Sequence, residues 1–195
     1  MNINPDRKLY SVRETYWIFY NGIRTMKYMA RARKNDSITL PFMERMMLAV
    51  TEVNRCSICS YAHTKVALEA GMSNEEVMHM LSGDLHEVPE EEQTAVLFAQ
   101  HYAYTRGKPS QKTWERVQEE YGVAVARGIL GATRAIMIGN AYGIPWSSFV
   151  NRFRGNADLR SSLLYELSMI TFGTLLIPVA LVHAAVAPLF KMPLI

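Results

Sequence analysis

The residues best suited to chemistry are the two cysteines, which lie three positions apart in the segment Cys56-Ser57-Ile58-Cys59. In such a pair one thiolate can attack a substrate, and the second thiol can then resolve the product as a disulfide. A helix that begins at the pair would place the positive end of its dipole beside the sulfurs, which lowers the pKa of a thiol. The spacing therefore predicts a redox-active cysteine pair.

Acid–base partners for this pair are found on both sides of it. His63 follows Cys59 by four residues, which places both on one helix face and brings an imidazole within reach of the thiol proton. Glu44 precedes the first cysteine by twelve residues. If two antiparallel helices turn near residue 54, Glu44 and His63 lie at similar distances from the turn. The carboxylate could then orient and charge the imidazole.

The elements that must position these groups are expected to be helices, because apolar residues recur at helical spacing and no convincing strand pattern appears. Gly143 and Pro145 are expected to end a long apolar helix at Tyr142. The predicted helices cover about 11–34, 41–53, 56–70, 73–81, 89–106, 110–121 and 123–142, and the chain from 157 to about 191. We expect one all-α domain over residues 1–195, with its core at about 40–145.

Composition fits a single globular domain of 195 residues, with 49% hydrophobic and 20% charged residues. A net charge of +3 is too small to indicate nucleic-acid binding. Residues 1–34 hold eight Lys or Arg and two acids. We interpret the basic residues near the end of the first helix as a solvated face with favourable charge at the helix C-terminus, in preference to a membrane-surface or partner-docking role. Two cysteines cannot form a secreted disulfide framework, and the N-terminus lacks the apolar core of a signal peptide. A reducing, cytoplasmic setting is expected.

The apolar C-terminal segment allows two interpretations. Residues 167–190 contain no Asp, Glu, Lys or Arg over 24 positions, which is long enough to span a bilayer. Pro178, Pro188 and several polar residues, including His183, interrupt this stretch. Because polar groups are costly in lipid, we favour a kinked helix pair in an oligomer interface over membrane contact.

The spacing Glu44–x11–Cys56-x-x-Cys59–x3–His63 resembles the alkyl hydroperoxidase D-like group of the carboxymuconolactone decarboxylase family. The resemblance is most specific over residues 41–70 and looser over 40–145. It implies an all-helical bundle, here with N- and C-terminal helical extensions, that assembles as trimers or hexamers. It also implies that Cys59 attacks, that Cys56 resolves, and that Glu44 and His63 relay the proton.

The expected function is thiol-dependent reduction of alkyl hydroperoxides, with a dithiol, lipoyl-bearing or thioredoxin-like reductant restoring the pair. No flavin or nucleotide motif is present, so we expect no cofactor and no metal. The best-studied members of the group have a second histidine where this chain has Ile58. A general disulfide reductase or redox sensor, and a non-enzymatic helical oligomer, stay open as alternatives. The intact pair argues against the lactone decarboxylation of the family's namesake.

Structural interpretations of the same residues also stay open. The two cysteines and His63 could bind zinc if Glu44, His79 or His86 supplied a fourth ligand, or the thiols could be inert core residues. Glu52 competes with Glu44 as the partner of His63. The remaining histidines are isolated in the sequence and are expected to be structural: His79, His86, His101 and His183.

Overall fold

The computed structural model describes residues 8–195, and all regular elements in that part of the chain are helical. The prediction of an all-α fold is therefore confirmed. The first seven residues, where no signal-peptide core was found, lie outside the described residues. The elements are α1 (Val12–Lys34), α2 (Leu40–Asn54), α3 (Ser57–Glu69), α4 (Asn74–Ser82), α5 (Glu90–Tyr104), α6 (Gln111–Phe153), α7 (Leu163–Val186) and the 3-10 helix η1 (Ala187–Phe190).

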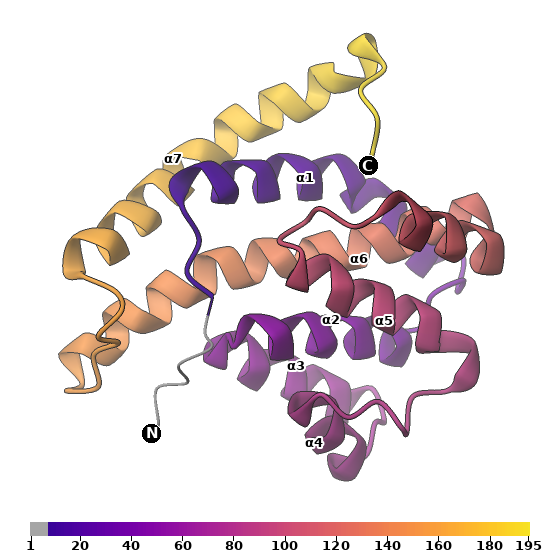
Figure 1. The fold of residues 1–195 in the computed structure, drawn as a ribbon, viewed down its shortest axis with the longest axis horizontal. Coiled ribbons are helices and arrows are strands. Elements are labelled where there is room, and N and C mark those ends of the chain that lie inside the picture. Colours follow the sequence, from indigo (N-terminus) through magenta and orange to yellow (C-terminus); the bar gives the residue numbers. More distant parts are fainter. Residues whose placement is uncertain (1–7) are drawn as a thin grey trace.

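The helices are arranged around α6, which runs through the middle of the molecule (Figure 1). One side of α6 is covered by α1, and α7 lies across the outer side of α1 (Figure 1). The other side of α6 packs against α2, α5 and α3, and α4 lies against α2 and α3. The core between these layers holds fully buried side chains such as Met46, Leu48, Ile129 and Met137. This arrangement brings α2, α3 and α6 together around the cysteine pair.

Helix starts follow the capping residues of the sequence. Ser11 and Glu14 form a reciprocal capping box at the start of α1. Thr39 caps α2 through its side chain, with Pro41 in the first turn. At α4 the Ser73 side chain accepts the backbone N–H of Glu76, at 3.0 Å, which is one half of a capping box. Such caps each contribute about 1 kcal/mol and locate the helix ends.

The turn between α2 and α3 lies at Arg55, one residue after the position that the sequence predicted. Arg55 adopts a left-handed conformation with φ 56°, and its N–H donates to the carbonyl of Thr51 at 2.8 Å. A non-glycine residue in this conformation costs about 1 kcal/mol. The turn contains neither Gly nor Pro, so the sequence gives no local signal for it. The Arg55 side chain pairs with Glu52 at 2.9 Å. The two helices form the expected pair on either side of this turn.

The long helix α6 does not end where the sequence predicted. It continues through Gly143 and Pro145 to Phe153, so the predicted end at Tyr142 is wrong. A proline inside a helix removes one hydrogen bond, but burial of apolar side chains on both sides of it can outweigh that loss. Ile144 is fully buried next to the proline. The predicted break at Gly122 does exist, with φ 71° and ψ 157°.

Helix α7 is one helix that continues through Pro178, so the prediction of a pair of helices is wrong, and Pro188 lies in η1. Two helical stretches, Gln111–Phe153 and Leu163–Phe190, are long and apolar enough to cross a membrane by length and composition. In the first, 56% of the most apolar window is buried, as in a core helix, whereas in the second only 22% is buried. The outer face of α7 thus exposes large apolar side chains, among them Leu175 and Val182.

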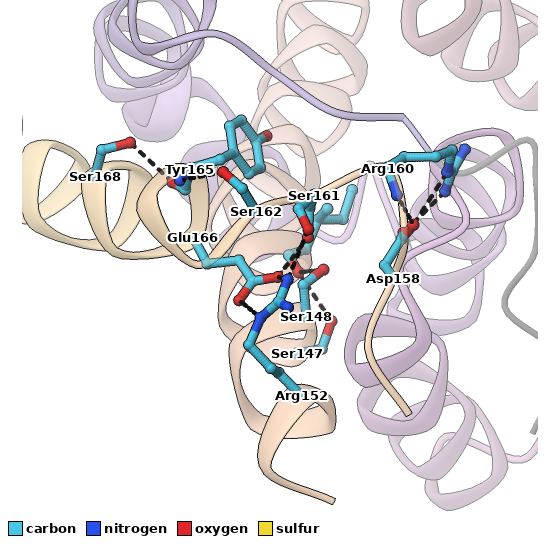
Figure 2. A network of polar contacts seen from close by, with 11 residues as sticks. Ser147, Ser148, Arg152, Asp158, Arg160, Ser161, Ser162, Tyr165, Glu166 and Ser168 are labelled. Carbon is cyan, nitrogen blue, oxygen red and sulfur yellow. Dashed lines mark hydrogen bonds and ion pairs between the residues drawn. The ribbon is translucent and has the colours of Figure 1, made fainter. Parts of the chain in front are cut away.

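A buried ion pair joins α6 to the start of α7 (Figure 2). The Glu166 carboxylate is fully buried and accepts hydrogen bonds from Nε and Nη2 of Arg152, both at 2.8 Å, and from the Ser161 hydroxyl. Burial works against the charge of Glu166, but these hydrogen bonds outweigh it and hold its pKa below the ordinary 4.5. A second ion pair lies in the connecting loop, where Arg160 Nη2 is 3.0 Å from Asp158 Oδ2.

We expect Arg152→Met to lower the thermal midpoint by about 5 °C at pH 7, because it leaves the Glu166 carboxylate buried without a cation. Since the folded-state pKa of Glu166 is lowered, this contribution is present above about pH 4.5 and is lost as the pH falls through the lowered value. The gap to wild type should therefore narrow in acid. Arg154→Met, at an exposed position two residues on, is the control. Equal midpoints for the two variants would contradict the assignment.

Candidate active site

The two cysteines lie at the start of α3. Cys56 is the N-cap residue, Cys59 lies in the first turn, and their sulfurs are joined as a disulfide. The unpaired N–H groups of a first turn and the helix dipole stabilise a thiolate formed there once the disulfide is reduced. The structure thus places the pair where the sequence predicted a helix to begin.

The two cysteines differ in their relation to a neighbouring cavity. Cys56 is 1% exposed, whereas Cys59 is 7% exposed and lines a cavity of about 600 Å³. His63, one turn further along α3, lines the same cavity. A small molecule in this cavity would therefore meet Cys59 and His63 together, whereas Cys56 is not among the lining residues.

Glu44 and His63 form a hydrogen-bonded pair across the α2–α3 turn. Glu44 Oε2 lies 2.7 Å from His63 Nδ1. The Glu44 side chain is 2% exposed, and that of His63 is 22% exposed. When Nδ1–H donates to the carboxylate, Nε2 is the ring nitrogen that can accept a proton. The competing carboxylate, Glu52, pairs with Arg55 instead.

Helix α6 closes the site from the opposite side through Gly143. A Cβ atom at this position would lie 3.0 Å from the Cys59 sulfur and 3.1 Å from the Cys56 sulfur. A side chain at this position would force the sulfurs or the α6 backbone to move by a few tenths of an ångström, so glycine permits the close approach. The sequence predicts a helix end at Gly143 and gives no indication that this residue belongs to the site. The signal that could have found it is its four-residue spacing from Gly139, which also lines the cavity.

The other walls of the cavity are apolar. They are formed by Ile58 from α3 and by Ile136, Tyr142 and Trp146 from α6. Ile58 and Trp146 are each 42% exposed. Ile58 occupies the place of the second histidine found in the best-studied members of the group that the sequence resembles, so this side of the cavity carries no acid–base residue. The arrangement suits a substrate with an apolar organic group.

We expect Gly143→Ala to slow disulfide formation by about tenfold and to lower the free energy of unfolding by about 2 kcal/mol. The reason is that the added methyl group must push α6 away from the two sulfurs. Both values can be measured by thiol titration during reoxidation and by urea unfolding. Gly139→Ala is the matched control, because its Cβ would meet its nearest atom at 3.8 Å. A Gly143→Ala protein that behaves like the control would show that the close approach is unimportant.

Within the described part of the chain, the structure does not bring together the possible zinc ligands Cys56, Cys59 and His63 with a fourth donor. The two sulfurs are bonded to each other, and His63 Nδ1 is engaged by Glu44. Nor do His79 and His86 fold back toward the cysteines; within residues 8–195 the grouped metal donors are these two histidines and Glu87. His183, in contrast, has the structural role expected of it, because a hydrogen bond of 2.6 Å joins its Nδ1 atom to the Tyr16 hydroxyl.

Comparison with known proteins agrees with the geometry of the site. Residues 21–100 match the carboxymuconolactone decarboxylase family. The matched segment contains both cysteines, Glu44 and His63. Searches of curated proteins and of solved structures gave no match.

The segment that matches the carboxymuconolactone decarboxylase family does not account for the whole cavity. The match ends within α5, whereas Gly143, Tyr142 and Trp146 lie on α6. The segment that matches the family therefore supplies the sulfurs and the Glu44–His63 pair. Ile58 also lies in this segment, whereas the apolar residues Ile136, Tyr142 and Trp146 come from the chain beyond it.

Proposed function

We propose that this chain is a thiol-dependent peroxidase that reduces alkyl hydroperoxides. The observation that carries the proposal is that Cys59 and His63 line one apolar cavity while His63 is held by the buried Glu44 carboxylate at 2.7 Å. Nucleophile, base and orienting group thus follow one another in the order that thiol activation requires.

The first step consumes the peroxide. In the reduced protein, His63 Nε2 takes the proton of the Cys59 thiol, and the carboxylate of Glu44 stabilises the imidazolium. The thiolate attacks the outer peroxide oxygen, and the O–O bond breaks. The alkoxide leaves with the proton held by His63, so an alcohol departs and Cys59 becomes a sulfenic acid.

The second step converts the Cys59 sulfenic acid into a disulfide with Cys56. The sulfur of Cys56 attacks the sulfenic sulfur of Cys59, and water leaves as the disulfide forms. The disulfide of the structure corresponds to the product of this step. An external dithiol then donates two electrons and two protons and returns both cysteines to thiols.

The walls of the cavity support an organic peroxide over hydrogen peroxide. A hydrocarbon group placed against Ile136, Tyr142 and Trp146 would lose contact with water, which favours binding by about 25 cal/mol per Å² of apolar surface. Hydrogen peroxide has no such group. We expect kcat/KM to be higher for cumene hydroperoxide than for hydrogen peroxide.

We further propose a cytoplasmic homo-oligomer, a trimer or hexamer, in which the apolar outer face of α7 is covered by another copy. The oligomer is supported by the low burial of α7. Only 22% of its most apolar window is buried within one chain. Membrane contact of residues 167–190 is the disfavoured alternative. The reductant would be a dithiol, lipoyl-bearing or thioredoxin-like partner that reaches Cys59 through the open cavity.

The proposed function is tested by measuring the loss of cumene hydroperoxide with dithiothreitol, dihydrolipoamide and reduced thioredoxin as separate reductants. Continuous, protein-dependent consumption with at least one dithiol is the expected result. No consumption with any of them would refute the peroxidase. Reduction of a disulfide substrate without peroxide consumption would assign the same cysteine pair to a disulfide reductase.

A further inference from the structure

A second cluster of reactive side chains lies away from the cysteines, where α4 ends and the chain turns toward α5. His79 is in the last turn of α4, and Asp84, His86 and Glu87 follow in the connecting loop. The rings of His79 and His86 meet edge to face, with centroids 4.4 Å apart. The expectation that these histidines are isolated is therefore wrong, because the turn brings residues seven positions apart into contact.

Asp84 holds both imidazole rings from one side. Its Oδ2 lies 3.2 Å from His79 Nδ1, and its Oδ1 lies 2.9 Å from His86 Nδ1. When each ring directs its Nδ1–H at the nearer carboxylate oxygen, both Nε2 atoms carry a free lone pair.

The two Nε2 atoms face a third donor, Glu87. Its Oε1 lies 4.0 Å from His79 Nε2 and 3.6 Å from His86 Nε2. Both distances are too long for hydrogen bonds. They are close to the separation of about 3.4 Å between ligands of one tetrahedral zinc ion with bonds of 2.0–2.2 Å.

The loop that carries these donors is anchored. Gly83 ends α4 in a left-handed conformation with φ 84°, and the N–H of Asp84 donates to the carbonyl of His79 at 2.9 Å. The N–H of His86 donates to the Asp84 carboxylate at 3.1 Å. Val88, directly after the donors, is 3% exposed and packs into the core. The donors therefore project from a fixed turn.

We propose that this turn binds a divalent transition-metal ion, with zinc as the best fit. His79 Nε2, His86 Nε2 and Glu87 Oε1 would be the ligands, and Asp84 would orient both rings, as carboxylates commonly do behind zinc-bound histidines. One ligand atom from each of the three residues lies within 4.8 Å of the others. Their partial exposure leaves a fourth position for water. The site is independent of the peroxidase proposal.

Zinc titration of the disulfide form, in which the cysteines cannot ligate, tests this site. A chelating dye in competition reports the affinity, and we expect one zinc ion per chain and a rise in thermal midpoint with zinc. His79→Ala and His86→Ala should each weaken binding by at least about 100-fold, and Asp84→Asn by about 10- to 100-fold. Circular dichroism checks that each variant folds.

The control for this titration is Glu69→Gln, which removes an exposed carboxylate at the end of α3 and should leave the zinc affinity unchanged. Absence of zinc binding by the wild-type protein would overturn the proposal. So would an affinity that survives both His79→Ala and His86→Ala.

Discussion

We expect replacement of Cys59 by serine to abolish peroxide turnover, with a loss of at least about 10³-fold, because the sulfur that must attack the O–O bond is gone. Cys56→Ser has a different expected result. In the absence of external thiol its Cys59 should react once and stay as a sulfenic acid, since the buried resolving thiol is missing. The loss of cumene hydroperoxide under excess dithiol gives the turnover, and a sulfenic-acid probe with mass spectrometry reports the trapped product.

The matched control for these variants is Ser57→Ala, an exposed position between the cysteines, which should turn over close to the wild-type rate. If Cys59→Ser kept turnover, or if the sulfenic acid formed on Cys56, the assignment of attacking and resolving roles would be wrong. A stable sulfenic acid on Cys59 in the Cys56→Ser protein would support both roles at once.

The second large effect is expected from the Glu44–His63 pair. His63→Ala should lower the second-order rate of peroxide reduction by about 10²-fold or more at neutral pH, because the thiol loses its base. The deficit should shrink as the pH rises and the Cys59 thiol ionises without help. Glu44→Gln keeps a hydrogen-bonding group beside His63 but removes the charge, so a smaller loss of about tenfold is expected.

Glu52→Gln is the control for Glu44→Gln, because Glu52 pairs with Arg55 rather than with His63. Both variants remove one carboxylate from α2, and only one should slow the reaction. Equal losses in the two variants, or a His63→Ala deficit that is the same at every pH, would show that the pair does not activate the thiol.

The parts of the fold that the sequence predicted depend on local interactions. Ser11 with Glu14, and Ser73 with Glu76, mark helix starts through side chains only three residues away. The facing of Glu44 and His63 required one further step, an antiparallel pair with a turn near residue 54. The facing of these two residues could be inferred because they lie at similar distances in sequence on either side of one turn.

The parts that the sequence did not predict depend on contacts between distant segments. Pro145 resembles a helix end, but α6 continues because its flanking residues are buried against other helices. Gly143 is needed at the disulfide only because α6 passes α3 at that point. The contact of His79 with His86 depends on the path of the chain after Gly83, which spacing alone does not give.

The most direct test of the peroxidase account is a single turnover without any external reductant. Fully reduced protein is mixed with one equivalent of cumene hydroperoxide, and thiols, peroxide and protein mass are followed together. The account predicts that both thiols of a chain disappear for each peroxide consumed and that an intramolecular Cys56–Cys59 disulfide forms. Peroxide that persists beside two intact thiols would contradict it.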